Sequence, residues 1–145
     1  MPNICIIGLG NPGAQYNGTR HNIGKDWIKS IAADCNLELH SKKKIQATVA
    51  MSSDEKILWG YPHQYVNESG HSINKIVKTT NFSLERIIII HDDLDLPIGN
   101  LKLKIGGGHG GHNGLRSIIS NSGQSFIRLR VGIGHPGNKV DVTNW

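Results

Sequence analysis

Hydrophobic residues along this chain follow two spacings, one typical of strands and one typical of helices. Residues 3–7 are mostly apolar and residues 87–90 are four isoleucines in a row, which predicts two buried strands. The continuous β-branched run is typical of a strand covered on both faces, as in the centre of a parallel sheet. In a strand predicted at 101–105, Lys102 and Lys104 alternate with apolar residues, so we expect one wet, basic face. Further strands are predicted at 45–51, 56–60 and 126–133.

Helical spacing separates several of these strands. Apolar residues recur every three or four positions between 23 and 31, which predicts a helix that ends near Asn36. A second helix is expected to begin near Glu68, and a third to span about residues 114 to 121. The order of these elements predicts an α/β fold around one mixed sheet, without a linker or repeat that would divide it.

Polar and glycine-rich clusters follow four of the predicted strands. They are GLGNPG with a later RHN (residues 8–13 and 20–22), YPHQYVNESG (61–70), HDDLDLP (91–97) and GGGHGGHNG (106–114). In open α/β sheets, ligands bind in crevices beyond the carboxyl ends of the strands. If these strands are mostly parallel, the four loops converge on one cleft, which is the expected functional site.

The first cluster also matches a nucleotide-binding fingerprint by spacing alone. Gly8, Gly10 and Gly13 fit G-x-G-x-x-G after the first strand. That fingerprint requires a helix that begins at the glycines, whereas helical spacing here starts roughly ten residues later. Glu38 is near the position of the expected acidic residue, but a basic run follows it. A nucleotide-dependent oxidoreductase is therefore disfavoured.

Composition and charge narrow the class of protein. The chain has 145 residues, which suits one domain, and carries a formal charge of +5 with a pI near 9.4. This balance favours a polyanionic partner, with nucleic acid the first candidate. No apolar stretch approaches the roughly 20 residues that span a bilayer, and no secretory signal is visible. Cys5 and Cys35 are expected to be buried thiols, which fits a reducing cytoplasm.

The predicted cleft contains several groups that could carry chemistry. The sequence has no G-x-S-x-G elbow and no cysteine in a cleft loop, which disfavours a covalent serine or cysteine enzyme. His109 and His112, with the acidic residues at 92, 93 and 95, leave a metal site open as one alternative. The other is a histidine–carboxylate pair that activates water. His21 is the best placed histidine for that role, opposite the Asp92 loop.

Neutral amides occupy the same loops. Asn11, Asn67 and Asn113 could hold the donors and acceptors of a peptide-like substrate without adding charge. Each of them could equally be a turn or cap residue. The amides therefore support a binding cleft only when they are taken together.

These motifs, in this order, resemble those of bacterial-type peptidyl-tRNA hydrolases. The match runs through IIGLGNPGAQYNGTRHNIG, YVNESG, HDDLDLPIG, KLKIGGGHGGHNGLRSI and RLRVGIGHPG. The resemblance implies a single three-layer α/β/α domain that hydrolyses the ester between a peptide and the terminal ribose of tRNA. It implies no metal or other cofactor. The expected partner is peptidyl-tRNA, bound through its acceptor end and peptide, and the protein is expected to be a cytoplasmic monomer with no membrane or obligate protein partner.

The resemblance also implies roles for individual residues. His21 corresponds to the catalytic base, and Asp92, the first acid of HDDLD, corresponds to its partner. The positions that correspond to substrate-binding residues are Asn11, Tyr16, Asn67 and Asn113, with Tyr16 beside the tRNA end. The candidates for contacts with tRNA phosphates are Lys102, Lys104, Arg116, Arg128 and Arg130, and the alternative for each is a solvated face.

Two features of the chain depart from the family pattern. Val66 stands where the family usually has methionine. Family members continue past GHPG, whereas this chain leaves the pattern after Lys139, so we expect it to lack the usual C-terminal lid and terminal helix. This leaves open an inactive truncated form, or a non-catalytic RNA-binding relative such as the plastid splicing factors. The presence of His21, Asp92 and the three asparagines together favours an enzyme.

Overall fold

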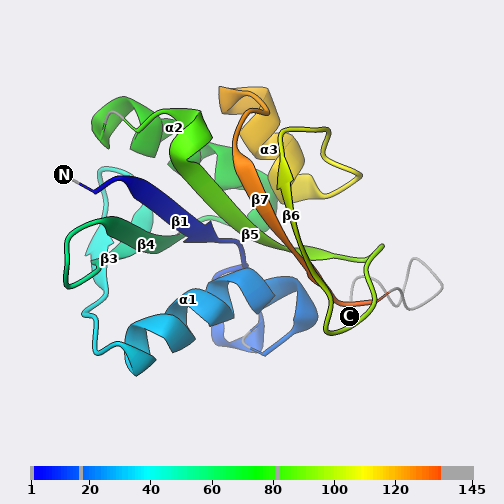
Figure 1. Ribbon diagram of the computed structural model, residues 1–145, viewed down its shortest axis with the longest axis horizontal. Helices are drawn as coiled ribbons and strands as arrows, with labels where there is room; N and C mark the ends of the chain where they lie inside the picture. Colours follow the sequence, from blue (N-terminus) through cyan, green and yellow to red (C-terminus); the bar gives the residue numbers. More distant parts are fainter. Residues whose placement is uncertain (1, 17, 81, 135–145) are drawn as a thin grey trace.

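The computed structural model describes residues 2–16, 18–80 and 82–134 (Figure 1), so the expected C-terminal departure lies outside the described residues. The strands are β1 (Ile4–Gly8), β2 (His40–Lys42), β3 (Ala47–Met51), β4 (Ile57–Pro62), β5 (Ile87–Asp93), β6 (Leu101–Ile105) and β7 (Ile127–Gly132). The α-helices are α1 (Ile23–Asp34), α2 (Ser69–Thr80) and α3 (Asn113–Ser122). Short 3₁₀ turns are η1 (Ala14–Tyr16), η2 (Arg20–Asn22), η3 (Val66–Glu68) and η4 (Leu84–Arg86).

The described strands form one mixed sheet in the order β2-β3-β4-β1-β5-β7-β6. The neighbouring pairs β1–β4, β1–β5 and β5–β7 are parallel. The pairs β2–β3, β3–β4 and β6–β7 at the two sides are antiparallel. The carboxyl ends of β4, β1, β5 and β7 therefore meet at one edge of the sheet, where an open α/β sheet binds its ligands.

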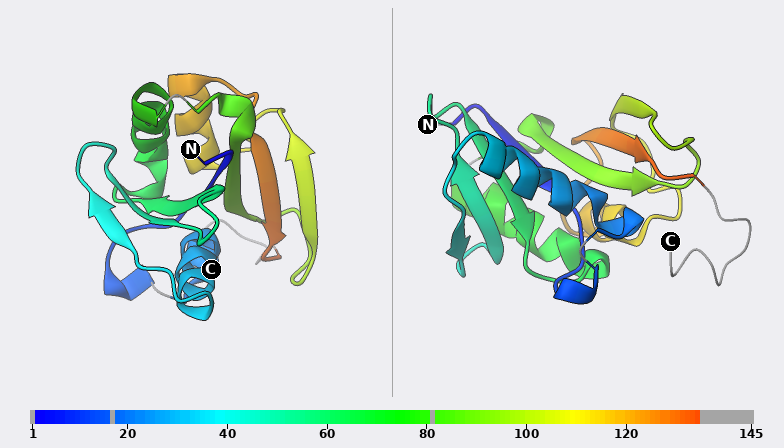
Figure 2. Two further views of the ribbon diagram at one scale, coloured as in Figure 1. Left: turned by 60° about the vertical axis from the view of Figure 1, so that its left-hand side comes forward. Right: turned by 90° about the horizontal axis from the view of Figure 1, so that it is seen from below.

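Helices cover both faces of the sheet and make the fold three-layered. Figures 1 and 2 show α1 on one face and the packed pair α2 and α3 on the other. Ile73 of α2 and Leu115 of α3 pack with Ile89 on their side, and Ile28 of α1 packs with Ile90 on the opposite side. Each such buried side chain contributes about 1.5–3 kcal/mol through removal of apolar surface from water. The isoleucine run of β5 is thus divided between two cores, as expected for a central strand.

Two glycines let α1 lie against the sheet at the edge that carries the site. A Cβ on Gly24, in the first turn of α1, would lie 2.3 Å from the carbonyl oxygen of Ile90. A Cβ on Gly8, at the end of β1, would lie 2.0 Å from the carbonyl oxygen of Gly24. No side chain fits such spaces, so glycine permits this close approach. The approach brings the residues just before α1, including His21, to the end of β5.

Most predicted elements are confirmed, with shifted ends. The first α-helix begins at Ile23, ten residues after Gly13, so the glycines open no α-helix and the nucleotide fingerprint fails on context. The short strand β2 was not predicted, because its polar sequence has no apolar spacing. β5 continues through Asp93, so Asp92 and Asp93 belong to the strand and do not follow it.

The edge strand β6 corrects two expectations. Because β6 is antiparallel to β7, the loop at 106–112 leaves the sheet at the opposite end from the other three loops and reaches the site by running back. The strand also has no dry face, since Leu101, Leu103 and Ile105 are 52%, 70% and 79% exposed. These residues lie beside β7 on the face of α1, but α1 packs mainly on β1, β5 and β4 and does not cover them.

The expectation of two buried thiols is correct for Cys5 and wrong for Cys35. Both cysteines are free; Cys5 is buried in β1, and Cys35 is exposed where α1 ends. Burial raises the pKa of the Cys5 thiol to about 12, so this side chain is unreactive near neutral pH. Among the described residues, no helix is both long and apolar enough to cross a membrane.

Candidate functional site

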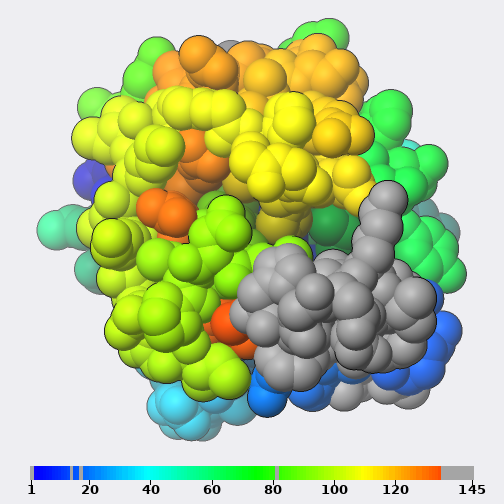
Figure 3. Space-filling view, turned by 90° about the vertical axis from the view of Figure 1, so that its right-hand side faces the viewer, coloured from blue at the N-terminus to red at the C-terminus, as the bar shows by residue number. Residues whose placement is uncertain are grey.

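A pocket of about 1120 Å³ lies at the carboxyl ends of the parallel strands. Figure 3 shows the molecule from this side, with the loop before α3 (yellow) above the segment that follows β5 (yellow-green). The pocket brings together residues predicted from four separate segments of the sequence, namely Asn11, His21, Asn67, Asp92 and Asn113. The convergence of distant polar clusters on one cleft is therefore a property of the folded chain.

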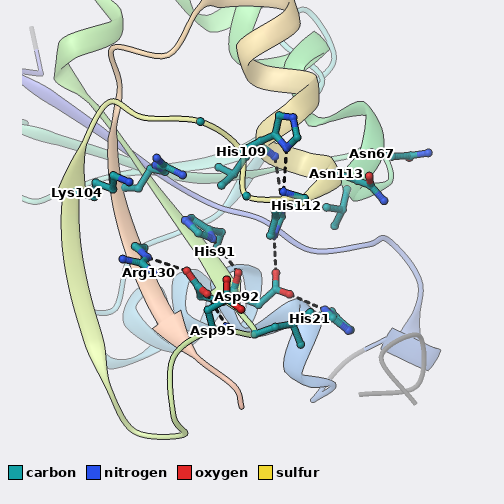
Figure 4. Close-up of a pocket in the computed structure, with 18 of the residues that line it drawn as sticks. His21, Asn67, His91, Asp92, Asp95, Lys104, His109, His112, Asn113 and Arg130 are labelled. Carbon is teal, nitrogen blue, oxygen red and sulfur yellow. Dashed lines mark hydrogen bonds and ion pairs between the residues drawn. The ribbon is translucent and has the colours of Figure 1, made fainter. Parts of the chain in front are cut away.

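His21 and Asp92 form a close pair in this pocket (Figure 4). His21 is part of η2, just before α1, and its Nδ1 lies 2.5 Å from Oδ2 of Asp92 near the end of β5. A carboxylate only accepts hydrogen bonds, so Nδ1–H donates to Asp92 and Nε2 carries the lone pair of the neutral ring. An imidazole held in this tautomer is suited to general base chemistry.

The Asp92 carboxylate is buried and ionised. Its side chain is 7% exposed, and burial alone would raise the pKa of the carboxyl. Electrostatic attraction to His112, followed by the hydrogen bonds from His112 and His21, outweighs burial and holds the pKa of Asp92 well below its usual range. Asp92 therefore keeps its negative charge throughout the neutral range, where it can stabilise an imidazolium at His21.

His112, which the sequence suggested only as a possible metal ligand, is a second imidazole on the same carboxylate. Its Nε2 lies 2.7 Å from Oδ1 of Asp92, the oxygen that His21 does not use (Figure 4). The H-x-x-H partner, His109, has a different role, since its Nδ1 accepts a hydrogen bond of 2.9 Å from the backbone N–H of Gly111. In the ranges that the structure describes, no group of three or more His, Cys, Asp or Glu side chains is arranged to hold a metal ion.

His91 of β5 packs against His112, and its role was also not predicted. It directly follows the four isoleucines, and no spacing in the sequence marks it as part of the site. It is 2% exposed, and its Nδ1–H donates to the backbone oxygen of Asp92 at 2.8 Å. Its ring packs edge-on against His112 with 5.1 Å between centroids. Burial first, and the neighbouring His112 second, lower the pKa of His91 to about 4. His91 is therefore neutral at the pH where His21 would act.

Asn11 is held from three directions. Its backbone N–H donates to Oδ1 of Asn22 at 2.8 Å, and its carbonyl oxygen accepts from Nδ2 of Asn22 and from the ammonium of Lys25. Its side-chain oxygen accepts from the backbone N–H of Val66 at 2.7 Å, which ties the first loop to η3. Because Oδ1 is engaged, the amide –NH₂ of Asn11 is directed away from Val66.

Comparison with known proteins identifies the family. The family model described as peptidyl-tRNA hydrolase matches residues 5–145. The chain belongs to this family. A relative named peptidyl-tRNA hydrolase from Aliarcobacter butzleri is 46% identical over 140 residues, which covers 97% of this chain and 75% of the relative. A relative of the same name from Rickettsia canadensis is 45% identical over 144 residues, which covers 98% and 78%.

Solved structures confirm the peptidyl-tRNA hydrolase fold. The crystal structure of peptidyl-tRNA hydrolase from Acinetobacter baumannii matches with a TM-score of 0.91 and 42% identity, covering 99% of this chain and 75% of that one. A structure of a peptidyl-tRNA hydrolase in complex with N-propanol also matches with a TM-score of 0.91 and 42% identity, covering 98% and 74%. The predicted family and the three-layer α/β architecture around a mixed sheet are therefore confirmed.

Of the other residues predicted to bind substrate, Asn67 and Asn113 line the pocket, whereas Tyr16 lies behind a residue that does. Asn67 in η3 and Asn113 at the start of α3 are exposed in the pocket wall, where α3 packs against η3. Tyr16 is not among the described residues that line the pocket. Its ring packs edge-on against Tyr65, which does line it, with 6.3 Å between centroids. Tyr16 therefore supports the rim of the pocket.

The five cations proposed for tRNA contact divide into two groups. Arg128 and Arg130 are engaged within the protein, which the alternation of β7 could not reveal. Arg128 is 5% exposed and donates to the carbonyl oxygen of Gly106 at 2.6 Å, and Arg130 donates to Asp93 at 2.7 Å. The exposed cations, on β6 and α3, are Lys102, Lys104 and Arg116, of which Lys104 lines the pocket.

Burial of neutral His91 predicts a loss of stability in mild acid. In the unfolded chain His91 takes up a proton as the pH falls through 6.5, whereas in the folded protein it stays neutral until about pH 4. Between these values the unfolded chain binds more protons, so acidification lowers the free energy of unfolding, by an amount on the order of 3 kcal/mol.

The variant His91→Asn keeps a donor that can reach the Asp92 carbonyl but does not titrate. Acidification from pH 7 to pH 4 should therefore lower the free energy of unfolding of the wild-type protein more than that of the variant. Urea unfolding at several pH values measures both. The variant should be less stable at pH 7, because the shorter side chain leaves a cavity. Parallel loss of stability in the two proteins over this range would contradict the assignment.

Proposed function

We propose that this chain hydrolyses the ester between peptide and tRNA in peptidyl-tRNA, releasing both products, with His21 as general base and Asp92 as its partner. The observation that carries the proposal is the 2.5 Å contact between His21 Nδ1 and Asp92 Oδ2 inside the pocket. Membership of the peptidyl-tRNA hydrolase family supports the choice of substrate.

The chemistry is a direct hydrolysis by water. Nε2 of His21 removes a proton from a water molecule, which attacks the ester carbonyl. The imidazolium that forms stays bound to the ionised Asp92, so the positive charge develops beside a fixed negative one. The proton then leaves with the ribose hydroxyl of tRNA. An ester is reactive enough for this route to need neither a covalent nucleophile nor a metal.

The asparagines hold the substrate in this proposal. Asn11 has its side-chain oxygen bound to the backbone of Val66, so it offers an –NH₂ donor to the substrate. Asn67 and Asn113 add amide groups from η3 and from the start of α3, and fix the peptide backbone. Donors placed near the ester carbonyl also stabilise the oxyanion. The protein acts as a cytoplasmic monomer, without cofactor, membrane or obligate protein partner.

Incubation of the protein with N-acylated and with free aminoacyl-tRNA tests this proposal. The expected result is release of tRNA from the acylated substrate only, at the same rate with and without EDTA. In the matched variant His21→Ala, turnover should fall by about 10²–10⁴-fold while tRNA affinity is largely kept, because the base is lost but the binding surface is not.

The other outcomes are distinct. Binding of tRNA without any release would instead support a non-catalytic RNA-binding protein or an inactive form. Near-normal turnover in His21→Ala would show that another group is the base. Inhibition by EDTA would contradict a reaction without metal.

Electrostatic contact with tRNA phosphates predicts a strong dependence on salt. The logarithm of the affinity for tRNA should fall linearly with the logarithm of salt concentration, since each phosphate contact releases counterions. Lys104→Gln should reduce the magnitude of this slope by about one, as expected for one lost phosphate contact. Lys78→Gln, an exposed lysine at the far end of α2, should leave the slope unchanged. A flat salt response in the wild-type protein would contradict the contacts.

A further inference from the structure

His112 connects the start of α3 to the Asp92 carboxylate. It is the N-cap of α3, with extended backbone angles of φ −75 and ψ 118. Its Nδ1 accepts hydrogen bonds from the backbone N–H groups of Gly114 at 3.1 Å and Leu115 at 3.2 Å. Its Nε2 contacts Oδ1 of Asp92 at 2.7 Å. Both ring nitrogens are therefore engaged, on opposite sides of the ring.

These contacts determine the tautomer of His112. A nitrogen that accepts from backbone N–H groups has no proton of its own, so Nδ1 carries the lone pair. The proton of the neutral ring is then on Nε2, which donates to Asp92. An imidazolium would place a second proton at Nδ1, facing the N–H groups that it now accepts from, and would break the cap.

We propose that His112 is a positioning residue for the reaction, which acts through Asp92 by donating a fixed neutral N–H to the carboxylate that holds His21. This inference rests on the proposed function for its effect on rate. With one imidazole on each oxygen, the Asp92 carboxylate cannot rotate without losing a bond. The N–H of His112 also shares the negative charge of Asp92, which limits how strongly the carboxylate holds a proton on His21.

The charged and titratable groups around Asp92 show that His112, besides His21, is the side chain that bonds its carboxylate among the described residues. His21 reaches Asp92 from η2, and His112 reaches it from the start of α3. His91, on β5 itself, donates to the backbone oxygen of Asp92 and not to its carboxylate. The adjacent Asp93 is paired with Arg130. His112 is therefore the group, among the described residues, whose bond to the carboxylate complements that of His21.

The same residue links the base to the substrate amides. Asn113 is the first residue of α3, directly after His112, and α3 packs against η3, which carries Asn67. The packing is close, since a Cβ on Gly114 would lie 2.8 Å from Cγ1 of Val66. A shift of the α3 start would move Asn113 relative to His21, and misplacement by about 1 Å can cost roughly 10²-fold in rate.

Two substitutions separate the functions of the two ring nitrogens. In His112→Asn the side-chain oxygen takes the place of Nδ1 and can cap α3, but nothing reaches Asp92. In His112→Gln the amide nitrogen takes the place of Nε2 and can donate to Asp92, but the cap is lost. The readout is the acid limb of the kcat/KM–pH profile, which reports the base in the free enzyme.

The two variants should differ in opposite ways. In His112→Asn the acid limb should move to higher pH by roughly half a unit, because the unshared charge of Asp92 holds the proton on His21 more strongly. In His112→Gln the acid limb should stay at its wild-type pH. The matched control His109→Asn keeps the acceptor used by Gly111 and does not contact Asp92, so its acid limb should also stay in place. An unmoved acid limb in His112→Asn would overturn the proposal.

The tautomer itself is measured in the unaltered protein, which covers the case of a variant that does not fold. Nitrogen-15 NMR of the histidine rings should show the proton of His112 on Nε2 at neutral pH. A proton on Nδ1, or on both nitrogens, would overturn the proposal. This measurement requires no turnover, so it fails or succeeds separately from the proposed hydrolysis.

Discussion

The buried negative charge of Asp92 is the constraint on which the site depends. A carboxylate this far from water is stable only when donors replace its hydration, and here each oxygen has one imidazole donor. The two donors come from η2, which precedes β5 in the chain, and from the start of α3, which follows it. The helices that continue from these two segments, α1 and α3, cover opposite faces of the sheet (Figures 1 and 2). Removal of either would leave part of a buried charge unpaired. The charge therefore fixes the positions of the proposed base and of the helix that carries Asn113.

A second set of contacts determines where the first loop lies relative to that charge. The close approach of Gly8 and Gly24 seats α1 against β1 and β5. The reciprocal bonds between Asn11 and Asn22, on either side of His21 in the sequence, close the loop on itself. These backbone and amide contacts explain why a glycine pattern that resembles a nucleotide fingerprint serves a different purpose. The glycines permit close packing, and the residues between and after them carry the chemistry.

Most helices and strands, and the closeness of His21 and Asp92, could be predicted from the sequence. The burial of individual side chains could not be predicted where it depends on the order of strands in the sheet. Apolar spacing is local, so the helices and the isoleucine strand could be identified from it. The closeness of His21 and Asp92 could be predicted because polar residues at the carboxyl ends of parallel strands meet at one edge of the sheet. The role of His112 could not be predicted, because it depends on a loop that returns from an antiparallel strand. The burial of Arg128 and the exposure of Leu103 were missed for a related reason, since alternation gives the face of a strand but not whether a neighbour covers it. One signal for His112 was present in the sequence, namely its position just before the predicted third helix, where a side chain can cap the helix N-terminus.

The central claim is that His21 and Asp92 act as one unit in hydrolysis, and a double-mutant cycle on turnover tests it most directly. Asp92→Asn alone should lower kcat by about 10²-fold or more, since the amide can hold the wrong tautomer of His21 and brings no charge. If the carboxylate acts through the imidazole, the same substitution made in the His21→Ala protein should change kcat by less than about threefold. Losses that multiply in the double variant would contradict the account, because they would mean that the two residues act independently.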